Sequence, residues 1–178
     1  MEKLKEAPVL ETKRLRLRAH RLDDFAPCAA MWADPAVTRY IGGKPLSEEE
    51  TWTKLLRYIG HWSLLGFGYW AVEEKETGRF LGELGFADFK RDIQPSIKNT
   101  PEAGWILSPA AHGKGYASEA LGEALAWGDT HFAGSRTVCL IHPENTPSIR
   151  LAGKFGYEKL QRTSYKDHPV IMFSRVGT

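Results

Sequence analysis

Hydrophobic and polar residues follow two periods along this chain, and the periods predict strands and helices in succession. Apolar residues three or four positions apart predict helices between Asp24 and Asp34, from Ser47 to Gly66, from about 117 to Phe132, and from Asn145 to Gly156. Shorter alternating or wholly apolar runs predict strands near 15–17, 69–73, 79–89, 102–108, 137–142, 157–162 and 170–175. In the first of these, Leu15 and Leu17 alternate with Arg14, Arg16 and Arg18, which predicts a strand with one solvated face. Ser47 and Glu50 predict a capping box for the second helix, whose apolar face would consist of Trp52, Leu55, Leu56, Ile59 and Trp62. Residues 90–101 are polar and contain two prolines, which predicts a loop. Such mixing of strands and helices predicts an α/β domain.

One stretch in the second half of the chain joins a strand to a helix through a glycine-rich turn. The strand, 102–108, is followed by His112-Gly113-Lys114-Gly115-Tyr116-Ala117, and helical spacing starts directly afterwards. The first N–H groups of a helix have no partner within the helix, and the helix dipole makes that end positive. Two glycines let the backbone approach a ligand closely, and Lys114 adds a charge. The stretch therefore predicts an anion site suited to phosphate.

The two commonest phosphate-binding patterns fit this turn poorly. The P-loop pattern G-x-x-x-x-G-K-[ST] is absent. The dinucleotide pattern G-x-G-x-x-G/A is nearly met by Gly113, Gly115 and Ser118, but the acidic residue expected about 20 residues further on is missing. Taken alone, the glycine pair is as consistent with a plain strand-to-helix turn as with a phosphate site.

A second segment makes the interpretation of the turn as a ligand site more specific. His142-Pro143-Glu144-Asn145-Thr146-Pro147-Ser148 follows a strand and opens a helix that closes with Lys154-Phe155-Gly156-Tyr157. Residues 112–117 resemble the pattern [QR]-x-x-G-x-[GA], with His112 where Gln or Arg is usual. The two elements, in this order and separation, resemble the GCN5-related N-acetyltransferase (GNAT) family. The resemblance covers roughly residues 9–175 and is closest to the ribosomal-protein N-terminal acetyltransferase-like branch, whose first strand residues 10–18 resemble.

The resemblance implies a fold and a cofactor site. The fold is a mixed, mostly antiparallel sheet with helices on both faces, in which the parallel strands ending at Ser108 and His142 splay apart. Acetyl-CoA would lie with its pyrophosphate on the amides of residues 112–117 and its pantetheine arm along 106–108, and the Asn145 side chain would hold its amides. The residues implied in cofactor binding are Ile106, Leu107, Ser108, His112, Gly113, Lys114, Gly115, Tyr116, Ala117 and Asn145.

The resemblance also implies direct attack of an amine on the thioester. That reaction needs a stabilised oxyanion, an acceptor for the proton of the amine and a proton for the leaving thiolate. A backbone N–H near Ile106 or Leu107 would polarise the carbonyl, and Ser148 is the candidate donor to the thiolate, unless its role is to support the helix start. Glu102 is the first candidate proton acceptor and Glu83 the second, with a solvated residue at a strand end as the equally simple alternative for Glu102.

The acceptor is left open among primary amines, on a protein N-terminus or a small molecule. In the family, the first two helices and the loop between them cover the acceptor site, which makes Trp32, Arg39, Tyr40 and Trp52 candidates, although such residues are more often core or surface residues than ligands. Two other functions remain alternatives. The chain could be a non-catalytic acyl-CoA-binding sensor or interaction domain, or it could bind another phosphate ligand such as a nucleotide.

Length, charge and cysteine content limit the other classes of protein to which this chain could belong. The 178 residues predict a single acetyltransferase domain, 1–178, with 1–8 as an N-terminal tail. The net charge of +2 does not predict nucleic acid binding, and no apolar run approaches the ~18 residues of a membrane span. Two cysteines, predicted to be core thiols, and a charged N-terminus without a signal segment predict a cytoplasmic protein. The histidine and cysteine spacings predict no metal site. A homodimer is left open.

Overall fold

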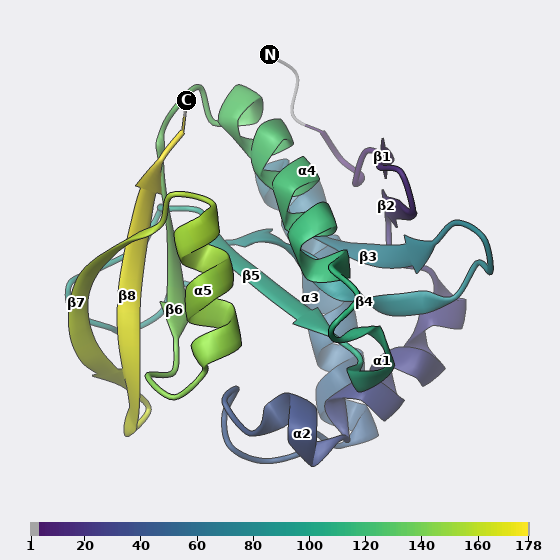
Figure 1. The fold of residues 1–178 in the computed structure, drawn as a ribbon, viewed down its shortest axis with the longest axis horizontal. Helices are drawn as coiled ribbons and strands as arrows, with labels where there is room; N and C mark the ends of the chain where they lie inside the picture. The colour runs from purple at the N-terminus through teal and green to yellow at the C-terminus, as the bar shows by residue number, and fades with distance from the viewer. Residues whose placement is uncertain (1–3, 178) are drawn as a thin grey trace.

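A computed structural model describes residues 4–177, which form one eight-stranded sheet with helices on both faces (Figure 1). The strand order is β1-β2-β3-β4-β5-β6-β8-β7. The strands are β1 (Leu10–Glu11), β2 (Leu15–Arg18), β3 (Tyr69–Glu74), β4 (Phe80–Ala87), β5 (Glu102–Leu107), β6 (Arg136–Ile141), β7 (Glu158–Tyr165) and β8 (His168–Val176). The helices are α1 (Phe25–Trp32), α2 (Pro35–Thr38), α3 (Glu48–Leu65), α4 (Tyr116–His131) and α5 (Thr146–Lys154).

Every neighbouring pair of strands is antiparallel except β5 and β6. These two parallel strands pair at only one position, Glu102 opposite Val138, and then diverge. Beside that pair, the Val138 N–H donates to the carbonyl of Pro101 at 3.0 Å. The predicted fold class is therefore confirmed, including the splay between the two central parallel strands. The splay leaves one edge of β5 without a partner strand along most of its length.

The two faces of the sheet are covered by different helices. Figure 1 shows α4 and α5 in front of the sheet and α3 behind it. On the α4 face, Trp70 of β3 and Leu84 of β4 are fully buried and pack in one core with Leu121 of α4. On the other face, Trp32 of α1 and Tyr58 of α3 pack with Tyr69 of β3 and with Ile106. Two cores therefore sandwich the strands that lead to the β5 edge.

Local sequence signals explain how the longest helix starts and ends. Ser47 accepts the N–H of Glu50, and the Glu50 carboxylate accepts the N–H of Ser47, which forms a capping box at the start of α3. Gly66 ends the helix in the left-handed conformation, at φ 79°. The predicted inner face of this helix was wrong in part, because Trp52, Leu56 and Ile59 are 38%, 49% and 47% exposed. Tyr58 and His61 are buried instead, because the side of the helix that faces the sheet is buried whatever the hydrophobicity of its residues.

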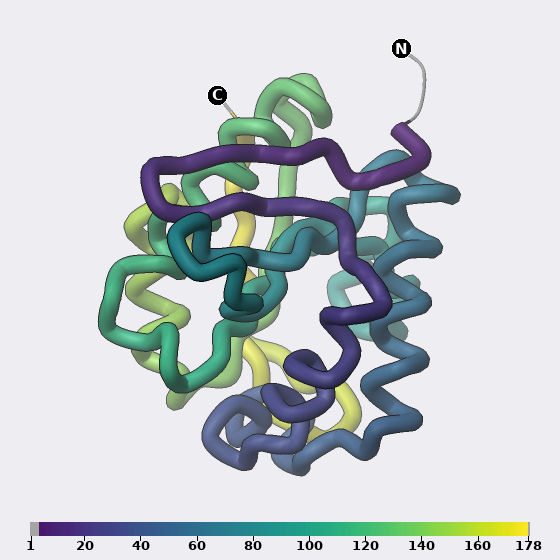
Figure 2. Tube along the Cα trace, turned by 90° about the vertical axis from the view of Figure 1, so that its right-hand side faces the viewer, coloured from purple at the N-terminus to yellow at the C-terminus, as the bar shows by residue number. Residues whose placement is uncertain are grey.

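The N-terminal segment also differs from its prediction. Figure 2 shows β1 and β2 running antiparallel across one side of the molecule. Arg18, predicted on a solvated face, is buried, because its guanidinium pairs with Asp24 at 2.8 Å and with Glu73 at 2.7 Å. Of the predicted tail, residues 1–3 lie outside the described residues, whereas Ala7 is buried and the carbonyl of Pro8 accepts the indole N–H of Trp70. Within residues 4–177, the search for a helix long and apolar enough to cross a membrane finds none.

Candidate functional site

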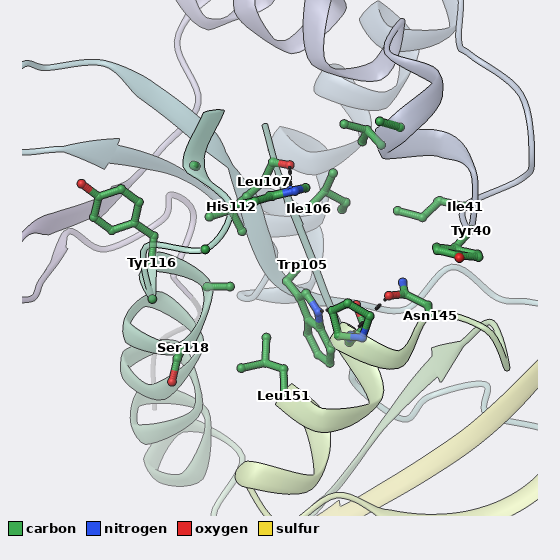
Figure 3. A pocket seen from close by; sticks show the side chains of 18 residues that line it. Tyr40, Ile41, Trp105, Ile106, Leu107, His112, Tyr116, Ser118, Asn145 and Leu151 are labelled. Carbon is green, nitrogen blue, oxygen red and sulfur yellow. Dashed lines mark hydrogen bonds between the residues drawn. The ribbon is translucent and has the colours of Figure 1, made fainter. Parts of the chain in front are cut away.

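A cavity of about 580 Å³ opens where β5 and β6 diverge (Figure 3). Its walls come from the end of β5, the turn that opens α4, the first turn of α5, and α2 with the residues after it. The lining residues are Ala36, Val37, Tyr40, Ile41, Trp105, Ile106, Leu107, Ala111, His112, Gly113, Gly115, Tyr116, Ala117, Ser118, Asn145, Pro147, Ser148 and Leu151. The structure therefore brings together the two sequence segments, around 112–117 and around 145–148, that are about 30 residues apart in the chain.

The glycine-rich turn presents the start of α4 to this cavity. Gly113 and Gly115 have φ angles of 72° and 77°, in the left-handed region that side chains disfavour. Gly115 is the N-cap residue of α4, and no side chain caps it. The first amides of the helix thus keep their hydrogen-bonding capacity for another partner. A Cβ added at Gly113 would meet no protein atom within 4 Å, so the backbone there is open to a ligand.

Arg14, just before β2, braces the turn from outside. Its Nη1 donates to the carbonyl of Lys114 at 2.9 Å, and its Nε donates to Glu119 at 2.7 Å. Thr12 Oγ1 donates to the same Glu119 carboxylate at 2.6 Å. The Arg14 guanidinium also lies 4.4 Å from the centre of the Tyr116 ring. The sequence pattern predicted only a solvated arginine here, and no spacing signal links residue 14 to residue 114.

The β5 edge that faces the gap has backbone groups available. Backbone groups of successive residues in a strand point to opposite sides. Ser108 donates its N–H toward β4, to the carbonyl of Leu81 at 2.8 Å. The N–H and C=O groups of Leu107 and Trp105 therefore point the other way, into the gap. The Leu107 carbonyl lies 2.9 Å from His112 Nε2, which ties the strand end to the turn (Figure 3).

Asn145 and Ser148 lie on the opposite wall, at the start of α5. Asn145 is the N-cap of this helix, and its side-chain oxygen accepts the N–H of Ser148 at 3.3 Å. This bond uses the Asn145 oxygen and leaves its NH₂ group to face the cavity. The Ser148 hydroxyl accepts the indole N–H of Trp105 at 3.2 Å, across the gap from β5. A hydroxyl that accepts this bond still has its own proton to donate.

Most of the predicted cofactor residues line the cavity. The exceptions are Ser108, which lies just past the end of β5, and Lys114, whose side chain is exposed and whose carbonyl is held by Arg14. Val37 and Ile41 line the cavity but were not predicted, because a helix of four residues leaves no periodic signal. Tyr40, a predicted acceptor-site residue, does line it, and its ring stacks on His142 at 5.3 Å between centroids.

Other candidates for the acceptor site do not meet at the cavity. Trp32 is buried and donates its indole N–H to Glu83 at 2.8 Å. Arg39 is exposed and lies 5.0 Å from the ring centre of Tyr40. Trp52 faces solvent on the outer side of α3, where it contacts Phe25. Of these, Arg39 lies beside the lining residue Tyr40, and Trp32 packs in one core with the lining residues Val37 and Ile106.

Glu102, the first candidate proton acceptor, is buried at the start of β5 and is already engaged. Both of its carboxylate oxygens accept from Arg91, at 2.7 Å and 2.8 Å. Burial lowers the pKa of Arg91, but the hydrogen bonds and charge of Glu102 outweigh it, so the pKa of Arg91 is raised. Glu102 does not line the cavity, although it lies on the same face of β5 as the lining residue Ile106. Its role in proton transfer stays a prediction.

Glu83, the second candidate, lies in a closed polar cluster beneath α1. It is 1% exposed, accepts from Trp32, and lies 3.4 Å from His20 Nε2 and 3.6 Å from Cys28 Sγ. Burial raises the pKa of Glu83, but hydrogen bonding and charge from His20 outweigh it, and the pKa is lowered. Ligand atoms of His20, Cys28 and Glu83 lie within 4.8 Å of one another, a grouping that chain spacing did not reveal because the loop after β2, helix α1 and strand β4 supply one residue each.

Comparison with known proteins identifies the family of this chain. The acetyltransferase (GNAT) domain family matches residues 14–158. The chain belongs to the GNAT acetyltransferase family. An uncharacterised N-acetyltransferase, p20, from Bacillus licheniformis is 31% identical over 151 residues, 84% of this chain and 82% of that protein. A putative GNAT-family acetyltransferase structure from Bordetella pertussis is 29% identical with a TM-score of 0.84, covering 96% of this chain and all of that one.

The predicted family is confirmed, and the GNAT chain is an acyl-CoA-dependent acetyltransferase. The ribosomal-protein-S5-alanine acetyltransferase of Vibrio fischeri shares the fold, with a TM-score of 0.71 over 96% of this chain and 97% of that one, at 16% identity. GNAT enzymes use acetyl-CoA, and the cavity fits such a co-substrate. Open amides lie at one end, and an unpaired strand edge runs along one side.

Proposed function

We propose that this GNAT acetyltransferase moves an acetyl group from acetyl-CoA directly to the primary amine of a small molecule or a protein N-terminus. The observation that carries the proposal is the single-position pairing of β5 with β6, next to a glycine turn with open amides. The pyrophosphate of acetyl-CoA would lie on the amides of residues 112–117. Its pantetheine arm would pair with the backbone groups of Trp105 and the N–H of Leu107, as an added strand does, while the Leu107 carbonyl stays tied to His112.

Side chains on the α5 wall would divide the remaining tasks. The NH₂ group of Asn145 would donate to a carbonyl of the pantetheine arm, because the Asn145 oxygen is used as the helix cap. The N–H of Leu107 or Trp105, which points into the gap, would stabilise the oxyanion on the thioester carbonyl. The Ser148 hydroxyl, steadied by Trp105, would donate its proton to the leaving sulfur.

The reaction itself is a displacement at the thioester carbon. The amine nitrogen forms a bond to that carbon, the carbon–sulfur bond breaks, and the sulfur takes a proton as CoA leaves. The amine must lose one proton, which Glu102 takes in our first assignment and Glu83 in the second. Since both carboxylates are already paired and neither lines the cavity, a water molecule would relay the proton to either of them.

Two measurements test the proposal in sequence. Acetyl-CoA should raise the melting temperature of the protein and ATP should not, because a ligand that prefers the folded state stabilises it. A panel of primary amines should then release CoA from acetyl-CoA, detected as free thiol, in proportion to N-acetylated product. Saturable acetyl-CoA binding with no CoA release from any amine would instead support a binding domain. Equal stabilisation by ATP and by CoA would support a nucleotide site.

A further inference from the structure

Three cationic side chains gather on the side of β5 away from α4. Arg57 of α3 and Arg91 of the loop after β4 lie 4.6 Å and 4.7 Å from the centre of the Phe89 ring. Lys54, one turn before Arg57 on α3, lies with its ammonium 4.2 Å from the centre of the Trp32 ring. We call Lys54, Arg57 and Arg91 the cationic cluster. The aromatic rings fix these long side chains in place, so little conformational freedom is left to lose when they bind a ligand.

The cationic cluster carries more positive charge than its surroundings neutralise. Arg91 is paired with Glu102. Among residues 4–177, no carboxylate oxygen lies within 4.0 Å of the Lys54 ammonium or the Arg57 guanidinium. Burial lowers the pKa of Lys54 to about 8, the charge of Glu83 raises it, and the charges of Arg57 and Arg91 lower it further. The charges of Arg57 and Arg91 therefore act on the Lys54 ammonium.

The cationic cluster adjoins the cavity through the strand that carries the reaction. Cross-strand partners share a face, and the pairs Glu83–Ile106 and Gly85–Gly104 place Ile106, Gly104 and Glu102 on one face of β5. Ile106 lines the cavity, and Glu102 holds Arg91. Between them Gly104 has no side chain, and the Tyr69 hydroxyl occupies the position that a Cβ would take. Ile106 at the cavity and Glu102 beside Arg91 thus lie four residues apart on one face of β5, with the Tyr69 hydroxyl between them.

We propose that the acceptor of this enzyme is a small amine that also carries a carboxylate, which Arg57 and Lys54 bind. This inference rests on the proposed function and adds the class of acceptor. A guanidinium and an ammonium together suit a carboxylate, because charge-assisted hydrogen bonds to carboxylates are strong and directional. A polyamine would meet repulsion from the Lys54 ammonium and the Arg57 guanidinium. The carboxylate would anchor one end of the acceptor at the cationic cluster and leave its amine directed along β5 toward the thioester.

The first test compares matched acceptors at fixed acetyl-CoA. Each amino acid is paired with its carboxamide and with the amine that lacks the carboxyl carbon, and spermidine is included as a cationic acceptor. We expect kcat/KM, measured by CoA release, to be about 10-fold or more higher for the carboxylate than for its carboxamide, mainly through KM. Higher salt should raise KM for the carboxylate acceptor only. Equal or better turnover of spermidine or of the carboxamides overturns the inference while leaving the acetyltransferase proposal intact.

The second test changes the charge at an exposed position. Arg57→Gln should raise KM for the carboxylate acceptor about 10-fold or more, and leave KM for the matched carboxamide unchanged. Arg57→Glu should reverse the preference toward cationic amines. Arg162→Gln is the matched control, because Arg162 is an exposed arginine on β7 that forms no ion pair within residues 4–177. Unchanged selectivity in both Arg57 variants would refute the inference. Absence of CoA release from every amine with the parent enzyme would refute the proposed function instead.

Discussion

Replacing Gly115 with alanine should strain the backbone of the turn and so weaken the binding of acetyl-CoA. Its φ of 77° costs an L-amino acid about 1–2 kcal/mol, and a methyl group there would lie 3.5 Å from Arg14 Nη2, an ordinary contact. Gly115→Ala is therefore strained without a clash. If the turn relaxes in the free protein, acetyl-CoA must restore the strained form on binding. A cost of about 1–2 kcal/mol then corresponds to about a 5- to 30-fold rise in Kd.

Gly78 provides the matched control for this substitution. It lies in the β3–β4 turn at φ 68°, and an added Cβ there would meet nothing within 4 Å. Gly78→Ala carries a similar strain but should leave Kd unchanged. Its melting temperature should fall by about 2–8 °C, from 1–2 kcal/mol at about 2–4 °C per kcal/mol for a chain of this size. Isothermal titration calorimetry with acetyl-CoA measures both variants. Equal Kd values for Gly115→Ala and Gly78→Ala would mean that the turn does not hold the pyrophosphate.

The other predictions separate cofactor binding, catalysis and charge. Asn145→Asp keeps the oxygen that caps α5 but removes the NH₂ group, so KM for acetyl-CoA should rise with little change in melting temperature; an unchanged KM would assign Asn145 to capping only. Ser148→Ala should lower kcat by ~10² or more at unchanged acetyl-CoA affinity, and parent kcat would remove Ser148 as the acid. Glu102→Gln should slow turnover most at low pH, with recovery at high pH where more amine is neutral, and Glu83→Gln with this profile would transfer the role. Because the pKa of Lys54 falls from 10.5 unfolded to about 8 folded, the unfolded chain binds more protons between these values, so the unfolding free energy should rise with pH there; Lys54→Met should remove that rise.

The sequence predicted the parts of this site that depend on local patterns. The turn at 112–117 and the cap at Asn145 depend on a few neighbouring residues, and their positions in the fold follow from strand-to-helix order. The longer strands and helices were predicted in the correct order for the same reason, with the capping box of α3, whereas the two-residue strand β1 and the four-residue helix α2 were not predicted.

Contacts between distant segments could not be predicted in this way. Arg14 reaches Lys114 across 100 residues, and Arg91 reaches Glu102 from a loop without a periodic pattern. Arg18 was expected in solvent because alternation only distinguishes two faces of a strand, whereas Asp24 and Glu73 supply the charge that makes its burial favourable. Such ion pairs depend on the three-dimensional arrangement and leave no spacing in the chain.

The divergence of β5 and β6 has a mechanical consequence. Apart from one bridging position, the sheet consists of a five-stranded part, β1 to β5, and a three-stranded part, β6, β8 and β7. A molecule lying along the β5 edge and contacting α5 would act as a strut between the two parts. Acetyl-CoA should then slow amide hydrogen exchange as far away as β7 and β8, which it does not touch, and product release would loosen the whole enzyme rather than one loop.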